Sequence, residues 1–174
     1  MMKVNFIKQT SATQGGFGFS INIYDVIGSY KFVDLLQMEE LFDVDIQLPQ
    51  VREDIKMKGK KSLYLRGLFN SKKLSIKDFK LIQDKGIYYY LEGFSDSEEE
   101  WGKDKIIFKS LLSKFTDITK DSLSECYLIN KEWFNANSNK VKAREFALYD
   151  FYFIILWIDK KDNSKLYISE WFSD

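Results

Sequence analysis

Apolar and polar residues alternate along several short stretches of this chain, which is the pattern of a β-strand with one buried face. The stretch FGFSINIYDV places four apolar residues at one parity: Phe17, Phe19, Ile21 and Ile23. Residues 3–9 form a similar stretch, and the polar segment SATQGG (11–16) separates the two. The pattern therefore predicts an N-terminal hairpin with a loop at 11–16.

The C-terminal part of the chain predicts a second hairpin. Residues 149–158 are almost all aromatic or β-branched, which is typical of a strand that is buried on both faces. The polar segment DKKDNSK follows, and residues 166–172 alternate again. We expect residues 149–158 to lie in the centre of a sheet, with 159–165 as a turn. The carboxylates in that turn could contact a cation, but they lack the spacing of an EF-hand loop.

Two segments have the spacing of amphipathic helices. Residues 30–42 place apolar side chains at 32, 35, 36, 38, 41 and 42. A second stripe has spacings of 4, 4 and 3 and consists of Ile107, Leu111, Phe115 and Ile118. Its N-cap is expected at Ser95 or Asp96. Residues 123–134 fit either a strand or a helix, and the helix is favoured.

The centre of the chain predicts a β-meander. Its strands would span 62–69, 74–83 and 87–94, with a tight turn at Asp84-Lys85-Gly86 between the last two. Residues 46–51 contain Pro49, which restricts them to an edge strand or a loop.

Together these elements predict an α+β fold with a mostly antiparallel sheet. We expect six to eight strands, including hairpins and a central meander, with two to four helices packed on one side of the sheet. At 174 residues, of which 45% are hydrophobic and 17% aromatic, the chain is expected to form a single domain over 1–174.

Histidine is absent and cysteine occurs once, at Cys126. These facts exclude histidine-based hydrolases, phosphotransfer and zinc sites, and they exclude an internal disulfide. We therefore expect no enzyme activity, no cofactor and no bound metal, although a carboxylate pair for glycoside hydrolysis stays open. The N-terminus has no apolar signal region, and the run 151–158 is too short to cross a membrane. We expect a cytoplasmic protein that does not bind membranes.

The net charge of zero conceals an uneven distribution. Residues 59–91 carry 8 basic and 2 acidic side chains, whereas residues 92–174 carry 12 basic and 16 acidic ones. The densest acidic stretch, DSEEEW, has two interpretations. It either begins a helix, where carboxylates stabilise the N-terminal dipole, or forms a surface that binds a basic partner. The candidate partner-binding residues are Asp96, Glu98, Glu99, Glu100, Trp101, Glu170, Trp171 and Asp174.

The basic meander 59–91 supplies an alternative. A sheet face with tyrosines among lysines and arginine can stack bases and hold phosphates. Lysines also simply keep the solvent face of a sheet soluble. The candidate nucleic-acid-binding residues are Tyr64, Arg66, Lys72 and Lys73.

In type, although not in any motif, the chain resembles the small immunity proteins that bacteria encode beside secreted toxins. The resemblance implies an α+β domain without catalytic groups and with an acidic, aromatic surface. We therefore expect a non-catalytic binding protein that blocks a basic toxin domain. The alternative is a nucleic-acid-binding or phage-type accessory protein, and the third interpretation is a carboxylate-based enzyme.

Overall fold

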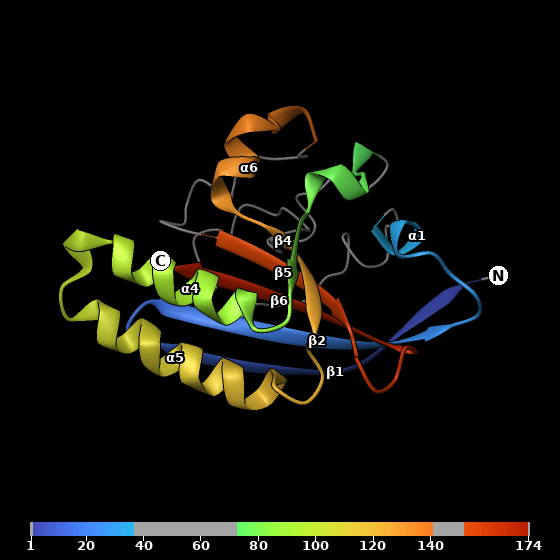
Figure 1. The fold of residues 1–174 in the computed structure, drawn as a ribbon, viewed down its shortest axis with the longest axis horizontal. Helices are drawn as coiled ribbons and strands as arrows, with labels where there is room; N and C mark the ends of the chain where they lie inside the picture. The colour runs from blue at the N-terminus through green and yellow to red at the C-terminus, as the bar shows by residue number, and fades with distance from the viewer. Residues whose placement is uncertain (1, 37–72, 141–151, 174) are drawn as a thin grey trace, which may run out of the picture.

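In the computed structural model, residues 2–36, 73–140 and 152–173 are described, and they build one mixed structure around a single sheet (Figure 1). The six strands have the order β1-β2-β6-β5-β4-β3, and each neighbouring pair is antiparallel. The strands are β1 (Lys3–Gln14), β2 (Phe17–Ile27), β3 (Lys80–Gln83), β4 (Glu125–Ile129), β5 (Tyr152–Ile158) and β6 (Lys165–Ser173). The predicted α+β fold with an antiparallel sheet is thereby confirmed.

The N-terminal hairpin is longer than the sequence predicts. β1 continues through most of the expected loop, and only Gly15 and Gly16 form the turn, both with positive φ (56° and 84°). Two successive residues with positive φ give the twist that a two-residue hairpin needs, and glycine adopts that conformation without strain. The predicted parity of Phe17, Phe19 and Ile21 is confirmed, since all three are buried on one face.

The C-terminal hairpin is also confirmed. β5 pairs with β6 on one side and with β4 on the other, so it lies inside the sheet as expected. Its two faces are both buried: Phe153, Ile155 and Trp157 lie in one apolar core, and Ile154 and Leu156 lie in the other.

Helices lie on both faces of the sheet, and the expectation of helices on one side is wrong. α4 (Gly86–Ser97) and α5 (Asp104–Thr119) run side by side across one face (Figure 1). On the opposite face, Leu35 and Leu36 of α1 (Phe32–Leu36) and Trp133 of α6 (Lys131–Ala136) contact the second core. Short 3₁₀ turns complete the described elements: η3 (Ile76–Asp78), η4 (Glu99–Trp101) and η5 (Ser138–Lys140).

The predicted meander is wrong where it can be compared with the structure. Residues 87–94 belong to helix α4, and residues 74–83 contain only the short strand β3 after η3. The three tyrosines of this stretch favour a strand locally, but Ile87, Leu91 and Ser95 are buried at a spacing of four residues. This helical stripe packs onto the sheet, and tertiary packing therefore overrides the local preference.

The remaining differences concern shorter segments. Residues 123–134, for which a helix was favoured, divide into strand β4 and helix α6. The predicted strands at 46–51 and 62–69, and most of the predicted helix 30–42, lie outside the described residues. Within the described ranges, none of the helices combines the length and the apolar character that a membrane span needs.

Candidate functional site

The acidic stretch Asp96–Trp101, called the acidic turn below, connects α4 to α5 at one end of the molecule (Figure 1). The sequence predicts that it begins a helix, and the structure contradicts this. Asp96 belongs to the last turn of α4, Glu99 and Glu100 form η4, and α5 begins only at Asp104. The error follows from the missed helix α4, because a strand at 87–94 would have required a new helix after it.

Three aromatic rings pack against Trp101, the last residue of the acidic turn. The ring centroid of Trp101 lies 5.0 Å from that of Phe17, 5.4 Å from that of Phe94 and 5.5 Å from that of Phe108. Such contacts contribute about 0.5–1.5 kcal/mol each beyond the burial of area. Trp101 is half-buried, so it fixes the turn to the core and does not serve as a protruding anchor.

The carboxylates of the acidic turn fall into two groups. Asp96 forms an ion pair with Lys109 at 2.8 Å, and Lys105 donates a hydrogen bond to the Asp96 carbonyl. The hydrogen bond from Lys109 lowers the pKa of Asp96 below its ordinary value. Within the part of the chain that the structure describes, the carboxylates of Glu98, Glu99 and Glu100 have no hydrogen bond or ion pair.

The C-terminal residues that the sequence grouped with this surface lie elsewhere. Glu170 (2% exposed) and Trp171 (0% exposed) are buried in β6, on opposite faces of the sheet. Trp171 stacks on Phe19 at a centroid distance of 5.1 Å. Their prediction as surface residues is wrong because β6 is an inner strand with both faces covered. Asp174 lies outside the described residues.

Glu170 belongs to a buried polar stripe that the sequence did not reveal. Ser20 donates a hydrogen bond to its carboxylate at 3.4 Å, and Asn22 follows on the same face of β2. Asn22 is fully buried, and neither atom of its amide has a hydrogen-bond partner within the described ranges. An unpaired buried group costs about 1–3 kcal/mol. The alternation in β2 marked these positions as solvent-facing, and only the cover on the second face buries them.

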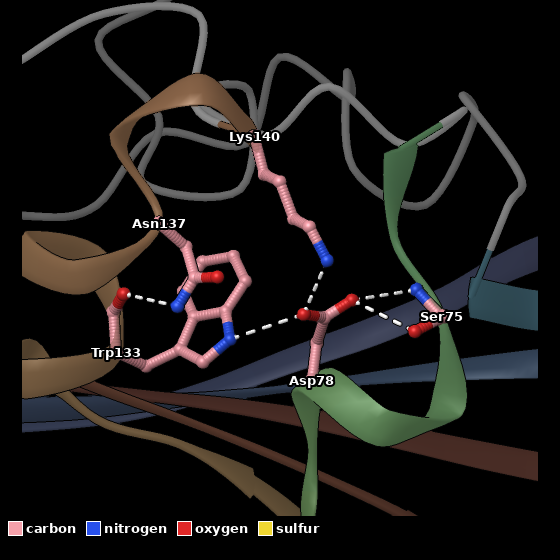
Figure 2. A network of polar contacts seen from close by, with 5 residues as sticks. All are labelled: Ser75, Asp78, Trp133, Asn137 and Lys140. Atoms are coloured by element: carbon pink, nitrogen blue, oxygen red, sulfur yellow. Dashed lines mark hydrogen bonds and ion pairs between the residues drawn. The ribbon is translucent and has the colours of Figure 1, made fainter.

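A second polar network surrounds Asp78 (Figure 2). One carboxylate oxygen accepts hydrogen bonds from Lys140 at 2.6 Å and from the Trp133 indole at 3.3 Å. The other accepts from the backbone N–H of Ser75 at 2.7 Å and from its hydroxyl at 3.1 Å. Burial acts to raise the pKa of Asp78, but the hydrogen bonds from Lys140 and Ser75 and the charge of Lys140 outweigh it and lower the pKa.

This network has the features of a structural clamp. Both oxygens of Asp78 are engaged, which leaves little capacity to bind a substrate or to transfer a proton. It joins η3 to α6 and η5 across about sixty residues of sequence. A perturbed pKa alone does not identify an active site, because structural ion pairs produce the same shift.

The residues of the nucleic-acid hypothesis are not assembled into a site by the described part of the structure. Tyr64, Arg66 and Lys72 lie outside it. Lys73 is exposed, and its ammonium donates to the backbone carbonyl of Asn139 at 3.1 Å. The hypothesis therefore stays a prediction.

Cys126 does not provide a nucleophile. It is fully buried in β4, and burial raises the pKa of its thiol to about 12. The negative charge of Glu125 acts in the same direction. A thiol with this pKa is protonated at neutral pH and unreactive.

Comparison of the chain with protein-family models, with curated proteins and with solved structures finds no match.

Proposed function

We propose that this protein is a non-catalytic binding protein that blocks a basic protein partner through the acidic turn, in the way that an immunity protein blocks its toxin. One observation carries the proposal. Three consecutive glutamates, the half-buried Glu98 and the exposed Glu99 and Glu100, lie in the connection between α4 and α5 without any ion-pair partner among the described residues.

The dipoles of the two long helices α4 and α5 do not explain these glutamates. They follow the C-terminal end of α4, where the helix dipole repels negative charge, and they precede α5 by several residues. Their mutual repulsion adds to this cost. Residues that violate local preference without compensation are expected at functional surfaces.

The charge around the turn is strongly one-sided. Residues 92–109 contain six carboxylates (Glu92, Asp96, Glu98, Glu99, Glu100 and Asp104) and three lysines (Lys103, Lys105 and Lys109), so their net charge is −3. Such a patch accelerates encounter with a basic surface. Since the aromatic cluster already holds the turn in place, little conformational entropy is lost on binding.

We assign the apolar contact that holds the complex to Ile106 and not to Trp101, because Trp101 packs against three rings of the protein itself. Ile106 lies in the first turn of α5, beside the acidic turn, and its side chain is 72% exposed. Ile106 does not belong to the buried face of α5. An apolar residue outside the apolar face of a helix can be recognised in the sequence as a candidate surface contact. A large exposed apolar side chain beside a charged patch is typical of a binding surface.

The mechanism is steric and electrostatic. The carboxylates would approach the basic active-site cleft of a toxin, and the helix connection would then exclude the toxin's substrate. No proton transfer or metal is needed from this chain, in keeping with its lack of histidine.

The test begins with the product of the neighbouring gene as the candidate partner, because toxins and their inhibitors are encoded together in the class that the chain resembles. The triple variant Glu98→Gln, Glu99→Gln, Glu100→Gln should slow association by roughly tenfold at low salt, and the effect should shrink as salt is added. Ile106→Ala should chiefly accelerate dissociation.

A charge-matched control removes three other exposed carboxylates: Asp117→Asn, Asp121→Asn and Glu132→Gln. It changes the net charge by the same amount but leaves the acidic turn intact. Equal slowing in the control would mean that net charge alone matters, and an unchanged rate in the triple variant would refute the acidic turn as the contact.

A further inference from the structure

The start of β4 and the β5–β6 turn lie at the end of the sheet away from the α4–α5 connection (Figure 1). Residues from these two segments line a small pocket together with Tyr30 and Phe32. Its volume is about 270 Å³. Its lining includes three aromatic residues, two acidic residues and one lysine: Tyr30, Phe32, Tyr127, Glu125, Asp159 and Lys160. Pockets for drug-sized ligands span roughly 300–1,000 Å³, so this one is suited to a single side chain.

One wall of the pocket is aromatic and rigid. Phe32 and Tyr127 stack with a centroid distance of 4.0 Å and an interplanar angle of 19°. The Tyr30 hydroxyl donates a hydrogen bond to the backbone carbonyl of Asn163 at 2.5 Å, which fixes the ring against the β5–β6 turn. Three aromatic rings around one opening resemble the walls that proteins use to bind organic cations.

Two acidic residues line the pocket. Within the described residues, the carboxylate of Glu125 has no hydrogen bond or ion pair. Asp159 accepts one hydrogen bond on each oxygen, from the Tyr167 hydroxyl at 3.0 Å and from the Lys161 backbone at 2.8 Å. Each of its oxygens keeps a further acceptor site.

The electrostatic environment of the pocket is negative. Burial raises the pKa of Tyr127, and the charge of Glu125 raises it further. Burial likewise raises the pKa of Tyr30, with a contribution from the charge of Asp162. Burial is the larger cause of both shifts, and only the smaller contribution, from the charges of Glu125 and Asp162, also favours a cation.

Lys160 also lines the pocket, and its positive charge opposes the binding of a second cation. The Lys160 ammonium donates to the Lys120 carbonyl at 2.7 Å, while the Lys160 backbone N–H donates to the Ser122 carbonyl at 2.8 Å. Both interactions hold the β5–β6 turn in place. Its charge offsets one of the two carboxylates, so the pocket's own lining carries a net charge of −1.

We propose that this pocket binds the guanidinium group of an arginine side chain presented by a protein partner. A guanidinium is planar and weakly hydrated, so it stacks on aromatic rings and pairs with a carboxylate through two parallel N–H groups. A lysine ammonium lacks both properties. Free arginine is a poorer fit, because its charged α-ammonium and α-carboxylate would have to be partly desolvated at the pocket, whereas an arginine within a peptide carries neither charge. The proposal is independent of the acidic turn, which lies at the opposite end of the molecule.

The test uses Nα-acetyl-arginine methylamide as the probe and follows the backbone amide signals of residues 124–127 by NMR. Saturable shifts are expected with the arginine compound. The neutral citrulline analogue should produce none, and the lysine analogue and free arginine should bind several-fold more weakly. An equal response to citrulline would refute ionic recognition. Equal binding of lysine would refute the guanidinium assignment, and tighter binding of free arginine would refute a protein source.

Three variants locate the interaction. Glu125→Gln should weaken binding about tenfold, and Glu125 is exposed, so the fold should survive the change. Lys160→Gln should strengthen binding several-fold because it removes the opposing charge, which a purely structural role of Lys160 does not predict. Glu132→Gln, on α6, is the control and should change nothing. Loss of binding in the control, or no effect of Glu125→Gln, would overturn the proposal.

Discussion

The clamp around Asp78 leads to the most quantitative prediction for this fold. Asp78→Ala removes an acceptor whose side chain is 7% exposed and leaves four donors without it: the Ser75 backbone and hydroxyl, the Trp133 indole and the Lys140 ammonium. Unpaired buried donors cost about 1–3 kcal/mol each. Lys140 is 24% exposed and can turn towards water, so its cost is small. We expect a loss of about 3 kcal/mol in the free energy of unfolding.

The measurement is urea unfolding at pH 7, followed by far-UV circular dichroism. Lys140→Met should cost less, about 1 kcal/mol, because Asp78 then keeps its bonds to Ser75 and Trp133. The double variant should lose less than the sum of the two single losses, since both remove the same ion pair. Asp84→Asn is the control: Asp84 is exposed with a φ of 51°, which asparagine also tolerates.

The pH dependence supplies an independent check with a definite sign. The folded-state pKa of Asp78 is lowered from 3.8, so its stabilisation is present above about pH 4 and is lost as the pH falls through the folded pKa. Asp78→Asn should flatten this acid-side loss. A loss below about 1 kcal/mol for Asp78→Ala, with an unchanged acid profile, would refute the clamp as a source of stability.

Five further outcomes test other parts of the structure. Neutralising Glu98 to Glu100 should leave the unfolding free energy unchanged or raise it by roughly 0.5 kcal/mol, whereas a loss would restore a helix-stabilising role. Gly93→Ala, in open space on α4, should stabilise by about 0.5–1 kcal/mol. Gly18→Ala, whose Cβ would lie 2.7 Å from the Phe172 ring, should destabilise by about 1–3 kcal/mol in the same assay. Cys126 should resist alkylation in the folded protein, and rapid labelling without denaturant would contradict its burial. Burial and the hydrogen bond to Asp159 raise the pKa of Tyr167 to about 12. Its stabilisation should therefore be complete below pH 10 and lost between about pH 10 and 12. Tyr167→Phe should reduce the loss seen in alkaline unfolding curves, to which the other tyrosines with a raised pKa also contribute.

The sequence by itself determined the elements in which local pattern and final environment agree. The alternation in β2 and the apolar run of β5 each identify an element whose buried face is visible in the order of residues. The predicted stripe of α5 identifies the helix but only part of its buried face, because Leu111 and Phe115 are buried whereas Ile118 is 46% exposed. The N-terminal hairpin was also predicted from local information, but as a loop over residues 11–16, whereas β1 continues to Gln14 and only Gly15 and Gly16 form the turn.

The candidate site illustrates what the sequence leaves open. The acidic stretch was visible as charge, but its place between two helices depends on whether residues 87–94 form a strand or a helix. Local preference favours the strand, and the contacts of Ile87 and Leu91 with the sheet decide for the helix. Beside three glutamates Trp101 was expected to be an exposed anchor, yet it packs against the nearby rings of Phe94 and Phe108 and against Phe17 from β2.

Tertiary structure alone decided everything that depends on which segments meet. Ser20, Asn22 and Glu170 become buried because the second face of the sheet is covered as well. The alternation of residues within one strand does not show whether the polar face of that strand is covered. Asp78 meets Lys140 from 62 residues away, and the pocket combines side chains from the β2–α1 connection, α1, β4 and the β5–β6 turn. The physical reason is that periodicity records only which side of an element is apolar. The partner that covers that side is chosen by the packing of the whole chain.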